Sequence, residues 1–61
     1  MDRNSLLSLR RRFDGLPLSS YKELGLRRVR DALALEGRNP ERVAELVAQA
    51  RAYLPYAEAR R

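Results

Sequence analysis

Apolar residues recur three or four positions apart in three stretches of the chain, which is the spacing of one face of an α-helix. The first stripe consists of Leu6, Leu9 and Phe13. It predicts a helix over residues 4–13 with Asn4 as its N-cap. Gly15 follows as a stop signal, because glycine readily adopts the left-handed conformation that ends many helices. Pro17 then predicts an extended link to the next stretch.

The second stretch predicts a helix over residues 20–36 that is apolar on more than half of its circumference. Ser20 and Glu23 have the spacing of a capping box at its start, and Gly37 is placed to end it. The apolar arc consists of Tyr21, Leu24, Gly25, Leu26, Val29, Ala32, Leu33 and Leu35. A helix with so wide an apolar arc is expected to contact two neighbours, so we predict that it is the central helix.

The third stretch predicts a helix over residues 40–54 that begins with Asn39 as the N-cap and Pro40 at the first helical position. Its apolar stripe consists of Val43, Leu46, Val47, Ala50, Tyr53, Leu54 and Ala57. Pro55 falls inside this stripe and has no backbone N–H to donate. The helix is therefore expected to kink or stop at Pro55, with a short last turn over residues 55–60.

These stretches predict one all-α domain over residues 1–61, a small three-helix domain in which the second and third helices form an antiparallel hairpin. A chain of 61 residues buries only about 60% of its unfolded surface, so its core is marginal. Small domains are often stabilised by disulfides, a metal or a partner chain. This chain contains no Cys and no His. Efficient helix packing or oligomerisation must then supply the stability, which is a first indication of self-association.

The lack of Cys and His also removes the commonest metal ligands and catalytic bases. Glu41 and Glu45 share a helix face, but it is the polar one. We therefore expect no enzymatic activity, no catalytic, cofactor or metal site and no small-molecule substrate. No apolar run approaches the roughly 20 residues of a membrane span, so no membrane association is expected. A cytoplasmic location is the default expectation, although an N-terminus rich in Arg and Ser is also found in transit peptides.

The net charge is +5, and 12 of the 13 basic residues are Arg. This balance favours nucleic acids or acidic proteins as partners. The candidate phosphate contacts are Arg10, Arg11, Arg12, Arg28 and Arg30. A solvated surface is the simpler interpretation, because three consecutive helical residues fan out over about 200°. Arg10 can also pair with Asp14, and Arg27 with Glu23. Phosphate binding would require Arg28, Arg30 and one of the first three arginines to share a face.

Two partial resemblances to known motifs occur in the second and third helices. The hairpin resembles a tetratricopeptide repeat at Tyr21, Leu24, Gly25, Ala50 and Pro55. Its loop is several residues too long, and one such repeat cannot bury its own apolar face. The segment 24–30 resembles the bend and basic helix of a helix-turn-helix, but Arg27 occupies the position of the capping Ser or Thr. Neither resemblance carries a function to this chain.

Two classes of function remain. The wide apolar arc favours a non-enzymatic helical protein–protein interaction module that self-associates or binds a larger acidic protein. Its candidate partner contacts are Leu24, Leu35, Leu46, Tyr53 and Tyr56. This interpretation predicts that the first or third helix leaves an apolar strip uncovered in the monomer. The alternative, favoured by the net charge, is a small basic protein that binds nucleic acid or is associated with transcription.

Overall fold

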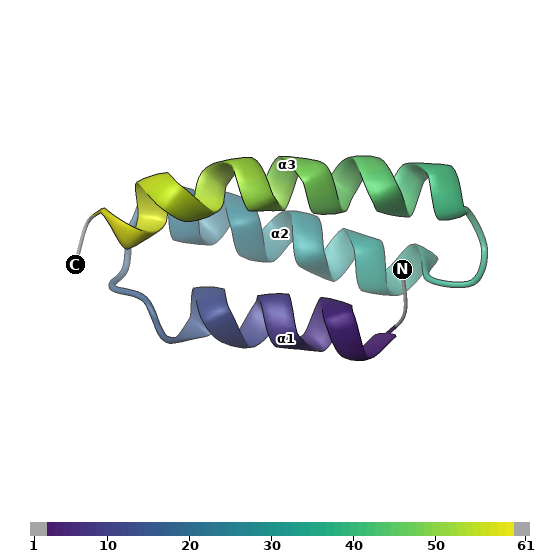
Figure 1. Ribbon diagram of the computed structural model, residues 1–61, viewed down its shortest axis with the longest axis horizontal. Helices are drawn as coiled ribbons and strands as arrows, with labels where there is room; N and C mark the ends of the chain where they lie inside the picture. The colour runs from purple at the N-terminus through teal and green to yellow at the C-terminus, as the bar shows by residue number, and fades with distance from the viewer. Residues whose placement is uncertain (1–2, 60–61) are drawn as a thin grey trace.

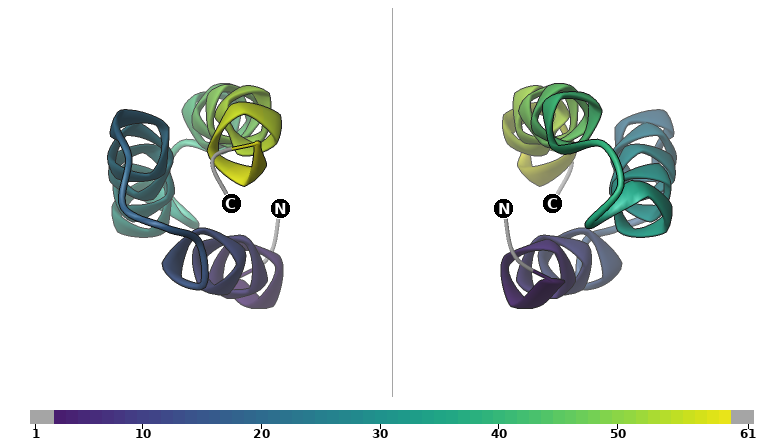
Figure 2. Two further views of the ribbon diagram at one scale, coloured as in Figure 1. Left: turned by 90° about the vertical axis from the view of Figure 1, so that its left-hand side faces the viewer. Right: turned by 90° about the vertical axis from the view of Figure 1, so that its right-hand side faces the viewer.

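The computed structural model describes residues 3–59, which form three α-helices: α1 (Arg3–Asp14), α2 (Ser20–Leu35) and α3 (Pro40–Glu58). The helices α2 and α3 pack along their length as an antiparallel hairpin (Figure 1). Seen end-on, the three helices occupy the corners of a triangle (Figure 2). The interface of α1 with α2 is larger than its interface with α3. The predicted all-α three-helix fold with its α2–α3 hairpin is confirmed.

The centre of the triangle is a single apolar core. Its buried residues are Leu6, Leu9, Phe13, Leu16, Val29, Ala32, Val43, Leu46, Val47, Ala50, Leu54 and Ala57. None of the buried residues in the described part of the chain is polar or charged. The stripes of α1 and α3 therefore face inward over most of their length. Of the uncovered apolar strip expected on one of these helices, the described residues show the half-buried Tyr53 and the exposed Tyr56 on α3. The helix α2 keeps partly exposed apolar residues on both of its flanks.

The backbone of α2 meets the ring of Phe13 from α1 at Gly25. Both residues are buried, and a Cβ added at Gly25 would overlap three carbons of the Phe13 ring. Gly25 therefore allows an aromatic ring to pack against the backbone of α2. Because α2 continues through Gly25 without a break, the resemblance of segment 24–30 to a helix-turn-helix does not extend to the structure.

The N-cap of α2 is Ser19, so the predicted capping box of Ser20 with Glu23 is wrong by one residue. The Ser19 hydroxyl accepts a hydrogen bond from the backbone N–H of Lys22 at 3.1 Å. Ser20 is the first helical residue, which moves Glu23 one position too far along the helix to complete the box.

The two glycines expected to end helices behave differently. Gly37 has a φ of +81° and follows α2, as predicted. Gly15 is not in the left-handed region; its N–H continues the α1 pattern by donating to the carbonyl of Arg11 at 3.1 Å. The end of α1 is fixed instead by Lys22, whose ammonium donates to the carbonyl oxygens of Asp14 at 3.3 Å and Leu16 at 2.9 Å. These carbonyls would otherwise depend on water.

The helix α3 continues through Pro55 to Glu58, and does not stop at Leu54. Pro55 leaves the carbonyl of Arg51 without its helical donor. Both residues are exposed, so water can hydrate that carbonyl, which explains why the helix is not broken. The predicted end of the last turn, Arg60, lies outside the described residues.

Candidate interaction surfaces

The half-buried residues of α2 lie on two opposite flanks of the helix. Leu24 and Leu35 are eleven residues apart, which is close to three full turns, so they share the flank that faces α3. Leu26 and Leu33 are two turns apart and share the flank that faces α1. Since Leu24 and Leu26 differ by about 200° around the axis, α2 presents two separate surfaces.

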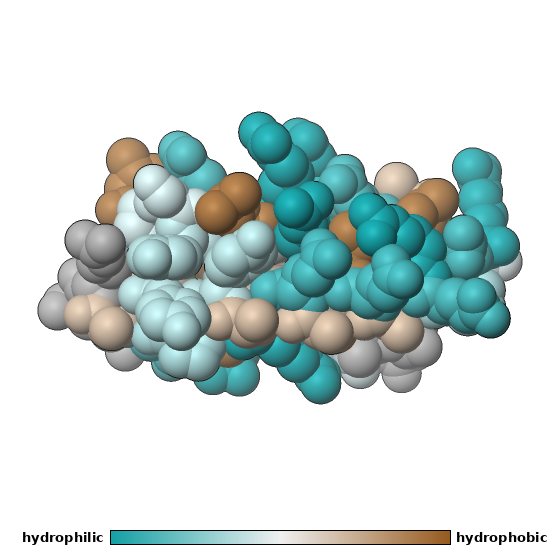
Figure 3. Space-filling view, turned by 90° about the horizontal axis from the view of Figure 1, so that it is seen from above, coloured by the Kyte–Doolittle hydropathy of each residue, from teal (hydrophilic) through white to brown (hydrophobic). Residues whose placement is uncertain are grey.

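The first surface lies along α2 and α3, and we call it the tyrosine surface. It consists of Tyr21, Leu24, Leu35, Tyr53 and Tyr56. The rings of Tyr21 and Tyr56 are stacked with centroids 5.2 Å apart, and the centroids of Tyr21 and Tyr53 are 6.4 Å apart. The face of the molecule in Figure 3 is pale, of intermediate hydropathy, at the end that carries the C-terminal part of α3, and more hydrophilic toward the other end.

Tyr56 is 60% exposed, in agreement with its predicted position off the apolar stripe of α3. Leu18, in the loop at the same end of the molecule, is 80% exposed. Within the described residues these are the large apolar side chains that are mostly open to solvent. Leu18 is not among the partner contacts predicted from the sequence, where it is visible only as an isolated leucine directly after Pro17, outside every helical stripe.

Four of the five predicted partner contacts lie on the tyrosine surface. Leu24, Leu35 and Tyr53 are half-buried, and Tyr56 is exposed. Leu46 is different, because it is only 1% exposed and belongs to the core. The prediction that Leu46 contacts a partner is therefore wrong for the folded chain: α2 covers it.

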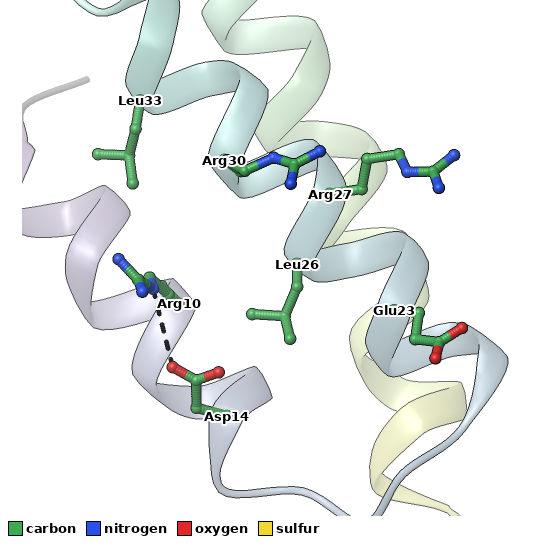
Figure 4. Close-up of a pocket in the computed structure, with 7 residues that line it drawn as sticks. All are labelled: Arg10, Asp14, Glu23, Leu26, Arg27, Arg30 and Leu33. Atoms are coloured by element: carbon green, nitrogen blue, oxygen red, sulfur yellow. Dashed lines mark ion pairs between the residues drawn. The ribbon is translucent and has the colours of Figure 1, made fainter.

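The second surface is a groove of about 610 Å³ between α1 and α2, which we call the arginine groove. It is lined by Arg10, Asp14, Glu23, Leu26, Arg27, Arg30 and Leu33. Figure 4 shows Leu26 and Leu33 projecting from α2 into the space between the helices, while Arg27 and Arg30 extend along the outer side of α2. The groove therefore combines an apolar floor with a charged rim.

The charges of the arginine groove are unequally paired. Arg10 forms the predicted i,i+4 ion pair with Asp14, with Nε and Oδ2 3.8 Å apart. The ion pair expected between Glu23 and Arg27 does not form within 4.0 Å, because such exposed pairs gain little over hydration. Neither Arg27 nor Arg30 forms an ion pair with any residue from 3 to 59, so both guanidinium groups are available to a partner.

The candidate phosphate contacts do not form one face. Arg12 lies on the α3 side, where its Nη2 is 3.6 Å from a carboxylate oxygen of Glu58, and Arg11 is exposed outside the groove. Arg28 lies on the flank of α2 opposite Arg30, and its Nε is buried without a hydrogen-bond partner. Arg28 therefore does not share a face with Arg30 and one of the three α1 arginines, as phosphate binding would require. The structure joins Arg10 and Arg30 with Arg27 instead.

The fold and its two surfaces define a small all-α domain built from a helical hairpin and one shorter helix. Comparison of the chain with protein-family models, with curated proteins and with solved structures finds no match. No helix within the described residues is long and apolar enough to cross a membrane. Residues 3–59 also contain no group of three or more His, Cys, Asp or Glu side chains placed to hold a metal ion.

Proposed function

We propose that this protein is a small non-enzymatic protein–protein interaction module that self-associates through the tyrosine surface. The observation that carries the proposal is the 60% exposed Tyr56, which stacks on Tyr21 beside half-buried leucines. Tyrosine is enriched at protein interfaces because its ring buries a large apolar area while its hydroxyl keeps a hydrogen bond. The tyrosine surface offers such anchors next to apolar residues that the monomer covers only in part.

The size of the molecule decides which part of this surface a dimer uses. A stable interface buries about 800 Å² on each partner. The molecule measures 34 × 17 × 13 Å, so its end has a projected area of roughly 220 Å² and its long side one of roughly 580 Å². The stacked tyrosines at one end are therefore too small an interface alone. A dimer must therefore use the long flank from Tyr56 to Leu35, which a twofold axis would pair with itself.

Sedimentation velocity over a range of protein concentrations tests the proposal. The wild-type chain is expected to shift from monomer toward dimer as its concentration rises, and to do so at low and high salt alike. Tyr56→Glu places a charge in the interface and is expected to weaken dimerisation at least about tenfold. Ser8→Glu adds the same charge at an exposed position of α1 and is the matched control.

A wild-type chain that remains monomeric up to millimolar concentration would overturn self-association. Equal effects of Tyr56→Glu and Ser8→Glu would show that net charge, rather than the tyrosine surface, controls association. Absorbance at 260 nm, recorded in the same runs, tests the alternative function, which is nucleic-acid binding. A monomer that carries nucleic acid at low salt and releases it at high salt would support a nucleic-acid-binding protein instead.

A further inference from the structure

We infer that the arginine groove is a second interaction site, which binds an acidic amphipathic helix of another protein. The groove lies on the flank of α2 opposite the tyrosine surface. The inference does not rest on self-association, because a monomer and a dimer built on the α3 side would both leave the groove open. An acidic helical partner would also account for the excess positive charge of the chain.

The floor of the groove has the geometry of a helix-binding surface. Leu26 and Leu33 are half-buried, project into the groove and are separated by seven residues, which corresponds to about 10.5 Å along α2. A partner helix that carries apolar residues at positions i and i+7 has the same spacing. Such anchors are how amphipathic helices bind hydrophobic grooves.

The rim of the groove determines the charge of the partner. Arg27 and Arg30 are one helical turn apart, lie beside the apolar floor and form no ion pair with any described residue. A guanidinium group presents two parallel N–H donors that match a carboxylate. Glutamates one turn apart on the partner helix could therefore each bind one arginine while the apolar anchors contact the leucines.

The same residues make nucleic acid a poorer fit to this groove. Arg10 is already paired with Asp14. Two unpaired arginines supply few of the phosphate contacts that nucleic-acid binding needs, and a phosphate backbone makes no use of an apolar floor. A protein helix uses both the floor and the rim.

Fluorescence anisotropy with designed peptides tests the inference. The probe is a fluorescein-labelled amphipathic helical peptide with two leucines seven residues apart and glutamates beside them. Two matched peptides replace the glutamates with glutamine or with lysine, and a labelled single-stranded DNA oligonucleotide represents nucleic acid. The groove variant is Arg27→Glu/Arg30→Glu. The control is Arg11→Glu/Arg51→Glu, which changes the net charge equally at exposed positions outside the groove.

The glutamate peptide is expected to bind the wild-type chain, and the groove variant is expected to bind it at least about tenfold more weakly. The control variant should stay within about threefold of the wild type, and the lysine peptide should bind the groove variant better than it binds the wild type. Equal losses in the groove and control variants would overturn the site. An oligonucleotide that binds more tightly than the glutamate peptide would overturn the class of partner. Circular dichroism of each variant confirms that it is folded.

Discussion

The contact between Gly25 and Phe13 makes the fold sensitive to one methyl group. Gly25 lies in the middle of α2, where alanine is the better helix former by about 1 kcal/mol. From helix propensity alone, Gly25→Ala would stabilise the protein. The added Cβ, however, would overlap three carbons of the Phe13 ring, closer than real Cβ atoms approach any neighbour. Packing and helix propensity thus predict opposite changes in stability for Gly25→Ala.

The structure indicates that packing dominates. Phe13 is fully buried, and the overlap involves the side of a rigid ring rather than the end of a flexible chain. Relief would require α1 to move away from α2 and would loosen the packing of the whole core. Overpacking of this kind costs about 1–3 kcal/mol, and more where the neighbour cannot turn aside. With a packing cost at the upper end, about 3 kcal/mol, and a gain in helix propensity of about 1 kcal/mol, we expect Gly25→Ala to lower the free energy of unfolding by about 2 kcal/mol.

Thermal and urea unfolding followed by circular dichroism measure this effect. A loss of about 2 kcal/mol corresponds to a fall in Tm of roughly 8–16 °C for a chain of this size. Gly15→Ala is the matched control, because a Cβ there meets only backbone oxygens at 3.7 and 3.9 Å and Gly15 does not have positive φ. This substitution is expected to be neutral or to stabilise by up to about 1 kcal/mol.

A double-mutant cycle identifies the cause. In a Phe13→Leu background the ring is gone, so Gly25→Ala should cost at least about 1 kcal/mol less than in the wild type. An unchanged or raised Tm for Gly25→Ala would refute the packing argument. An equal cost in both backgrounds would show that the loss does not arise from contact with Phe13.

Four further substitutions test local features of the helices by the same unfolding measurements. Ser19→Ala should cost about 1 kcal/mol and Ser20→Ala much less; the reverse order would place the cap at Ser20. Gly37→Ala should cost about 1 kcal/mol, although space around it is open, because φ is +81°; no loss would mean that this turn does not need a left-handed residue. Pro55→Ala should raise stability by about 1–3 kcal/mol by restoring a helical donor inside α3, and a lower Tm would contradict this.

The helices and the core were predictable from the sequence because each stripe is long enough to define one face. The caps were less predictable, since they depend on single contacts. Ser19 and Ser20 are adjacent and chemically identical, and the box pattern with Glu23 favoured the wrong one. In the structure the Ser19 hydroxyl accepts from the backbone N–H of Lys22, and the ammonium of the same lysine donates to the carbonyls of Asp14 and Leu16. These contacts are not visible in the sequence pattern.

The two surfaces were only partly predictable, because they depend on how α2 is rotated relative to its neighbours. The sequence identifies an apolar arc but does not assign its edges to α1 or to α3. The contact of Gly25 with Phe13 fixes this rotation, which places Arg27 at the rim of the arginine groove and leaves Arg28 outside the groove. Leu46 lies on the edge of the α3 stripe, and only the position of α2 shows that it is covered.

The completeness of the core changes the argument for self-association. The shortness of the chain and its lack of disulfides and metal ligands favour stabilisation by a partner, yet the core is continuous and contains no buried polar residue in the described part of the chain. The association that we propose through the tyrosine surface would then be a property of a folded monomer, and not a condition for folding. In an obligate dimer, Tm rises with protein concentration and a charge in the interface unfolds the chain. Here Tyr56→Glu is expected to yield a monomer with a Tm close to that of the wild type at high dilution, so folding and association can be measured separately.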